Sequence, residues 1–121
     1  MTLKQMYEKI DGNYESMAQR LRKEERIQKF VLLFLKDQSY ETFLRSWEQK
    51  NIEEAFRAVH TLKGVSLNLS FDRLFQITDK MTEVLRVQNI EEAIVLLPEL
   101  QHSYETHVQA ILEYVELANR G

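Results

Sequence analysis

The sequence predicts an all-α fold: an antiparallel up-down bundle of four long helices with one or two short helices at its N-terminal end. Three observations support this prediction. The chain has only one proline and three glycines, the residues that most often interrupt helices. Apolar residues recur every three or four positions, which is the period of a helix buried on one face. The candidate connections are short, and short connections make consecutive helices antiparallel.

Length and composition limit the classes of protein to which the chain can belong. Its 121 residues and net charge of −3 fit a single domain over residues 1–121, and the acidic balance does not favour nucleic-acid binding. The absence of cysteine excludes disulfides and suits a reducing cytoplasm. The longest apolar run, residues 30–35, is too short to cross a membrane, and we see no signal peptide. The initiating methionine and short termini favour a small stand-alone protein.

The N-terminal part is expected to form two short amphipathic helices, over residues 3–10 and 14–21. A longer and mostly apolar helix follows over residues 24–47. The polar run 36–39 either bends this helix or breaks it, and we predict one long helix with a bend.

Two nearly identical stretches, residues 51–55 and 89–93, mark the starts of two further helices. Each begins with asparagine, a preferred N-cap, and carries glutamate three residues later, which completes a pair resembling a capping box. These starts predict one helix over residues 52–69 and another from residue 90 through Val115.

Between them, another amphipathic helix is expected to bury residues from Leu74 to Leu85, with Ser70 or Asp72 as its N-cap. In the last helix, Pro98 lies inside the apolar pattern. It removes one backbone hydrogen bond, so it kinks the helix or restarts it.

The helix over residues 52–69 carries one patch of mixed chemistry. Its apolar stripe consists of Ile52, Ala55, Val59, Leu62, Ser66 and Leu69. His60 is rotated by about a hundred degrees from Val59 and so faces the edge or the solvent. Lys63 and Gly64 follow it by three and four positions, on the next turn of the same face. An imidazole, an ammonium and a missing side chain therefore share one patch.

These three residues suit phosphoryl chemistry, although plainer roles stay open. A neutral imidazole is a nucleophile, and the Lys63 ammonium can pair with phosphoryl oxygens. Gly64 costs about 0.5–1 kcal/mol relative to alanine inside a helix, and its benefit is room for a partner's backbone. Alternatively, His60 is an ordinary surface residue and Gly64 is a C-cap, although the apolar period continues beyond it.

The run 60–64, His-Thr-Leu-Lys-Gly, is followed by Asn68-Leu69 and by Leu74. This pattern resembles the signature of histidine phosphotransfer (HPt) domains, the helical bundle proteins of multistep phosphorelays. The resemblance extends over most of the chain, because the neighbouring helices fall where the family has them.

The resemblance implies that His60 is phosphorylated on Nε2, that Lys63 steadies the phosphoryl group, and that Gly64 gives clearance. The implied reaction is reversible transfer between His60 and an aspartate on the receiver domain of a response regulator. A hybrid sensor histidine kinase is the other implied partner, and we expect a monomer. The chain needs no cofactor of its own, because Mg²⁺ belongs to the receiver, and no ATP-dependent kinase activity is expected.

Two positions depart from the family pattern. Ser70 stands where the family usually has glycine. Thr82 stands where a Gln or Glu often lies near the histidine, and its hydroxyl can still hydrogen-bond the ring or a phosphate.

Receiver docking is expected to use apolar residues around His60. Phe56 and Leu67 bracket it, and Phe71 or Phe75 extends the patch, although each of these side chains can equally be plain bundle core. The expected polar rim consists of Arg57, Arg73 and Lys80, and Thr82 is also expected to contact the receiver.

Two other classes of function stay open. One is a phosphorylation-independent HPt-like module that binds a receiver or a sensor kinase, and the other is a scaffold bundle with a packed His60. His102 and His107 are five positions apart, the wrong spacing for a metal site on one helix face, and we expect both to face solvent.

Overall fold

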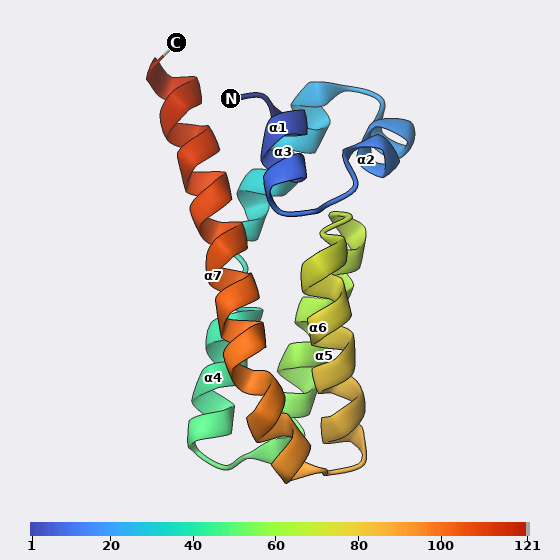
Figure 1. The fold of residues 1–121 in the computed structure, drawn as a ribbon, viewed down its shortest axis with the longest axis vertical. Helices are drawn as coiled ribbons and strands as arrows, with labels where there is room; N and C mark the ends of the chain where they lie inside the picture. The colour runs from blue at the N-terminus through green and yellow to red at the C-terminus, as the bar shows by residue number, and fades with distance from the viewer. Residues whose placement is uncertain (121) are drawn as a thin grey trace.

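The computed structural model describes residues 1–120, and these residues form seven helices and no strand (Figure 1). The predicted all-α fold is therefore confirmed. The helices are α1 (Leu3–Lys9), α2 (Tyr14–Leu21), α3 (Glu24–Phe34), α4 (Ser39–Glu48), α5 (Ile52–Asn68), α6 (Asp72–Arg86) and α7 (Ile90–Arg120). No helix within this part of the chain is long and apolar enough to span a membrane.

Helices α4 to α7 lie side by side, and each runs opposite to the one before it (Figure 1). Helix α5 packs against both α4 and α6, and α6 packs against α7. Helix α7 continues beyond this group, and α1 packs against its C-terminal half, with α2 and α3 close by (Figure 1). The molecule therefore has one half built from α4 to α7 and another built around α1, α2 and α3.

The two repeated asparagines cap their helices as the sequence predicts. Asn51 Oδ1 accepts a hydrogen bond from the Glu54 backbone N–H, and Asn89 Oδ1 accepts one from the Glu92 N–H, both at 3.2 Å. Each bond satisfies a backbone donor that has no partner inside the first helical turn. The start of α5, and with it the position of His60, is therefore fixed by local sequence.

The prediction of one bent helix over residues 24–47 is wrong. Helix α3 ends at Phe34 and α4 begins at Ser39. Between them, Asp37 Oδ1 accepts a hydrogen bond of 2.9 Å from the Ser39 N–H. Aspartate side chains that bind nearby backbone in this way compete with helical hydrogen bonds. The polar run therefore breaks the helix.

The turn between α5 and α6 is built at Ser70, which adopts a left-handed backbone conformation with φ 54°. Its N–H donates to the Leu67 carbonyl at 3.1 Å, and the Phe71 N–H donates to the Ser66 carbonyl at 3.0 Å. This is the Schellman pattern that glycine usually closes. The N-cap of α6 is Phe71, without a side-chain cap, so the prediction of Ser70 or Asp72 as the cap is wrong.

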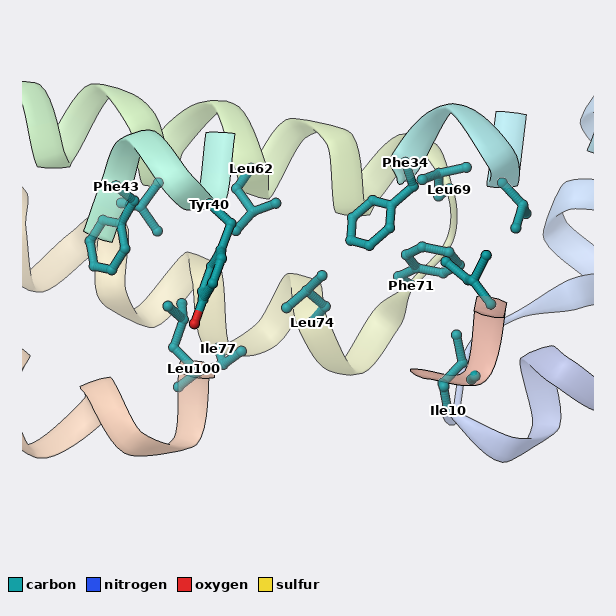
Figure 2. Packing of buried hydrophobic residues seen from close by; sticks show 14 of the residues in the cluster. Ile10, Phe34, Tyr40, Phe43, Leu62, Leu69, Phe71, Leu74, Ile77 and Leu100 are labelled. Carbon is teal, nitrogen blue, oxygen red and sulfur yellow. The ribbon is translucent and has the colours of Figure 1, made fainter. Parts of the chain in front are cut away.

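A row of aromatic side chains links the two halves of the molecule. Figure 2 shows three of them, Phe34, Tyr40 and Phe71, among the buried apolar residues. Phe71 lies between Tyr7 and Phe34, with ring centroids 5.5 and 5.3 Å away, and Phe34 lies 5.6 Å from Tyr104. Tyr104 stacks on Tyr40 at 3.7 Å. Because such pairs add to the burial of apolar area, the row makes the two halves share one core.

Helix α1 is tightly integrated into this core. Leu3, Met6 and Tyr7 are fully buried, and the Tyr7 hydroxyl donates a hydrogen bond of 2.7 Å to the Leu69 carbonyl at the end of α5. Thr2 and Gln5 form a reciprocal capping box that starts the helix. The shortest of the seven described helices therefore supports the end of the helix that carries His60.

Helix α7 is continuous, and one of its two histidines packs inward. The helix continues through Pro98, so the restart does not occur. Ile94 is 57% exposed, whereas His107 is fully buried. The prediction that His107 faces solvent is wrong, because it lies seven residues from both Leu100 and Tyr114 on the stripe that packs inward. His102 is exposed, as expected.

Candidate functional site

His60 lies on the exposed face of α5, in the middle of the helix. Its neighbours Val59 and Leu62 are fully buried and hold this helix against α4 and α6. The His60 ring lies 6.0 Å from the Phe56 ring, tilted by 38°. The imidazole therefore stands on a rigid element and is accessible from solvent, which contradicts the interpretation of a packed His60 in a scaffold bundle.

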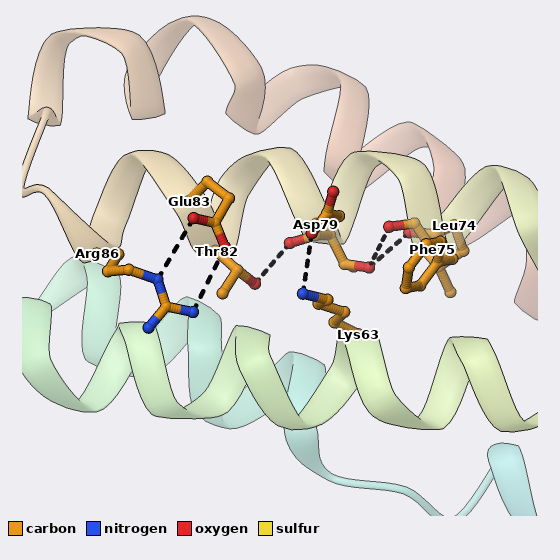
Figure 3. A network of polar contacts seen from close by, with 8 residues as sticks. Lys63, Leu74, Phe75, Asp79, Thr82, Glu83 and Arg86 are labelled. Atoms are coloured by element: carbon orange, nitrogen blue, oxygen red, sulfur yellow. Dashed lines mark hydrogen bonds and ion pairs between the residues drawn. The ribbon is translucent and has the colours of Figure 1, made fainter.

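Lys63 reaches across from α5 to α6 (Figure 3). Its Nζ lies 2.9 Å from Asp79 Oδ1 and 6.0 Å from the centroid of the Phe75 ring. The Lys63 side chain is 24% exposed and the Asp79 side chain 43%. The sequence did not identify Asp79, because this contact depends on how α5 and α6 align, which spacing along one helix does not reveal.

Gly64 leaves open space beside His60. A Cβ atom built at this position would have no heavy atom within 4 Å beyond its chain neighbours and the adjacent helix backbone. Helix α5 continues to Asn68, so the interpretation of Gly64 as a C-cap is wrong. The missing side chain therefore widens the approach to this face and does not end the helix.

Two contacts fix the register between α5 and α6. The Arg86 guanidinium lies 5.0 Å from the Phe56 ring centroid, and Lys63 pairs with Asp79. Seven residues separate the two contact positions on each helix, as expected for an antiparallel pair. This register places His60 level with Thr82.

The side chain of Thr82, however, does not face His60. It is fully buried, and its hydroxyl donates a hydrogen bond of 2.7 Å to the Thr78 carbonyl one turn earlier in α6 (Figure 3). The expectation that Thr82 helps to bind a phosphate or to dock a receiver is therefore wrong. At this position a threonine satisfies its hydroxyl within its own helix.

The outward face of α6 near His60 carries Asp79, Glu83 and Arg86 instead. Arg86 lies 3.4 Å from Glu83 through two contacts, so Lys63 and Arg86 are each next to a carboxylate of α6 (Figure 3). None of these three residues was identified from the sequence. Their spacing of four and three positions was the available signal, because it places three charged or polar groups on one helical face.

The structure separates the predicted docking residues into two groups. Leu67 is 57% exposed, Phe56 and Phe75 are half-buried, and Arg57 is exposed. Phe71 is fully buried, so its proposed place in the docking patch is wrong. Phe56 and Arg86 also line an open groove between the start of α5 and the end of α6.

Two residues of the expected polar rim, Lys80 and Arg73, differ in their ion pairing. Lys80 and Arg73 are exposed, and Arg73 pairs with Asp11 at 3.0 Å. Within residues 1–120, no group of three or more His, Cys, Asp or Glu side chains is placed to hold a metal ion.

Comparison with known proteins adds one finding. No curated protein and no solved structure matches the chain. A family model described as Hpt domain matches residues 16–113, which include the whole of α5 and α6. Because this match covers well over half of the chain, the resemblance seen in the sequence is confirmed, and the chain belongs to the Hpt domain family.

Proposed function

We propose that this chain is a phosphocarrier of a multistep phosphorelay, which holds a phosphoryl group on Nε2 of His60. Membership of the Hpt family places the chain in phosphorelay signalling. The single observation that carries the finer proposal is the exposure of His60 on α5, one turn before Lys63 and the open space at Gly64.

The proposed reaction is a reversible exchange between His60 and an aspartate of a receiver domain. The Nε2 lone pair attacks the phosphorus of the aspartyl phosphate, the N–P bond forms, and the P–O bond to the carboxylate breaks. The carboxylate leaves as the anion, and the reverse sequence returns the phosphoryl group. The chain supplies the nucleophile and a nearby cation, and transfer is otherwise a matter of positioning and charge.

Docking would use the same face of α5. Leu67 and Phe56 offer apolar surface on either side of His60, and Arg57 offers a cation beside it. A receiver that covers this surface would exclude water from the transfer, which strengthens the electrostatic interactions there.

The test uses a receiver domain with Mg²⁺ and a small-molecule phosphodonor. We expect acid-labile, alkali-stable label on the wild-type chain and none on His60→Gln. His102→Gln is the matched control, because His102 is also an exposed histidine of the bundle, and it should keep the label. Label that survives His60→Gln would refute the phosphocarrier assignment.

Lys63→Ala tests the neighbouring cation. We expect slower transfer with little change in stability, because the lysine belongs to a partly exposed ion pair. Receiver binding without any labelling of the wild-type chain would favour the phosphorylation-independent module instead.

A further inference from the structure

Lys63, the lysine three positions after His60 on α5, forms an ion pair with Asp79 of α6. The ammonium lies 2.9 Å from Asp79 and 6.0 Å from the Phe75 ring. In the register described above, Asp79 and Phe75 lie level with Lys63 and with the C-terminal part of α5, whereas His60 lies level with Thr82. The lysine is therefore held toward α6 and toward the end of α5 in the unphosphorylated chain.

Phosphorylation would change the charge balance of this face. A phosphoryl group adds about −1.5 to −2 charges near neutral pH and presents strong acceptor oxygens. Asp79 would then compete with the phosphoryl oxygens for the same ammonium, and its own charge would repel them. Both effects disfavour the phosphorylated form of His60 relative to the free form.

We propose that Asp79 is a positioning residue that lowers the stability of phospho-His60 by competing for the ammonium of Lys63. The inference rests on the proposed function, because it requires His60 to carry the phosphoryl group. Because phospho-His60 is then less stable, Asp79 favours transfer of the phosphoryl group to a receiver.

The experiment compares two versions of the full chain directly. Wild-type protein labelled with ¹⁵N is phosphorylated with phosphoramidate, whose P–N bond breaks to release ammonia as the His60 Nε2–P bond forms. It is then mixed with unlabelled Asp79→Asn and a trace of receiver domain with Mg²⁺, which passes phosphoryl groups between the two chains. Intact mass under alkaline conditions gives the fraction of each chain that is phosphorylated at equilibrium.

We expect the phosphoryl group to favour Asp79→Asn by about three- to fivefold, the range that one partly exposed charge pair supports. The matched control is Glu116→Gln, which removes a carboxylate from the exposed Arg120–Glu116 pair at the far end of α7. At equilibrium, Glu116→Gln and the wild type should be phosphorylated to the same fraction. In a Lys63→Ala background, Asp79→Asn should shift the ratio by less than about twofold, because only direct repulsion remains.

A second readout needs no receiver. The ¹⁵N signal of the Lys63 ammonium should move when His60 is phosphorylated in the wild type, because the ammonium exchanges one anionic partner for another. In Asp79→Asn the signal of the unphosphorylated chain should already differ from that of the wild type.

The outcomes separate the two proposals. No phosphorylation of the wild type at His60, or no exchange through the receiver, overturns the proposed function and this inference with it. Exchange with an even division between the wild type and Asp79→Asn overturns this inference alone. A ratio that favours the wild type would show that Asp79 steadies Lys63 for the phosphoryl group, and an equal shift with and without Lys63 would show that Asp79 acts as a charge only. Either result also overturns it.

Discussion

The Nδ1 atom of His107 lies 2.7 Å from the carbonyl oxygen of Ser103, one turn earlier in α7. A carbonyl only accepts hydrogen bonds, so Nδ1 carries the proton and Nε2 presents a lone pair in the neutral ring. Within residues 1–120, neither Nε2 nor the Ser103 hydroxyl has a hydrogen-bond partner. Burial lowers the pKa of His107 to about 4, and the Ser103 hydrogen bond opposes this shift only in part.

This arrangement predicts that the fold loses stability in mildly acidic solution. Well above pH 6.5 the imidazole is neutral in both the folded and the unfolded chain, so it adds no pH dependence there. As the pH falls from 6.5 toward 4, His107 becomes protonated in the unfolded chain but stays mostly neutral in the folded chain. The free energy of unfolding should fall by on the order of 3 kcal/mol from this residue. Urea denaturation at a series of pH values measures it.

His107→Leu provides the comparison, because leucine does not titrate. Its free energy of unfolding should depend less on pH over the same interval, whatever its absolute stability at pH 7. Parallel curves for the two proteins would show that protonation of His107 does not govern the acid response.

Gly64 allows stability and docking to be separated. Gly64→Ala should raise the free energy of unfolding by about 0.5–1 kcal/mol, because alanine is the better helix former and its Cβ meets open space. Gly64→Gln should fold normally but weaken receiver binding by about tenfold, or about 1.4 kcal/mol, because its side chain occupies the approach to His60. Thermal denaturation and a binding titration measure the two effects. Normal receiver binding by Gly64→Gln would show that Gly64 is not needed to leave room for the receiver.

Leu67 and Phe71 were both candidates for the docking patch, and the structure predicts opposite behaviour for them. Leu67→Ala should change stability by less than about 0.5 kcal/mol, because this side chain is 57% exposed, yet it should weaken receiver binding. Phe71→Ala should cost about 3–5 kcal/mol of stability, because the ring is fully buried between Tyr7 and Phe34. Denaturation curves and binding titrations on the same two variants distinguish these effects, and a large loss of stability in Leu67→Ala would contradict its exposed position.

Thr82→Val tests the orientation of the threonine at the level of His60. The variant should lose about 1 kcal/mol of stability or less, because it gives up only the hydrogen bond to the Thr78 carbonyl. The rate at which His60 gains and loses a phosphoryl group should stay unchanged. A clearly slower transfer in rapid-quench measurements would mean that the hydroxyl turns toward the ring during the reaction.

The starts of α5 and α7 and the exposed face of His60 could be predicted from the sequence, because both depend on residues close together in the chain. Asn51 and Asn89 cap their helices through residues three positions away. The break at Asp37 was harder to predict, because an apolar period alone fits both a bent helix and two separate ones.

Two further errors, at His107 and Asp79, concern contacts between helices. The burial of His107 depends on how α7 packs against several neighbours, and Asp79 meets Lys63 only when α5 and α6 adopt their register. Spacing along one helix does not define such packing. Thr82 is a similar case. Its position opposite His60 along α6 was predicted correctly, but the direction of its side chain was not, because its hydroxyl binds the Thr78 carbonyl.

The position of α1 affects how this domain can be shortened. The family match begins at residue 16, after the helix whose Tyr7 hydroxyl binds the Leu69 carbonyl and whose ring covers Phe71. A chain trimmed to residues 16–113 would keep His60, Lys63 and Gly64 but lose the side chains of α1 that pack in the core beneath α5. Such a fragment should have a lower melting temperature than the full chain. Poor phosphotransfer by the fragment could then result from the loss of α1 and would not count against the role of His60.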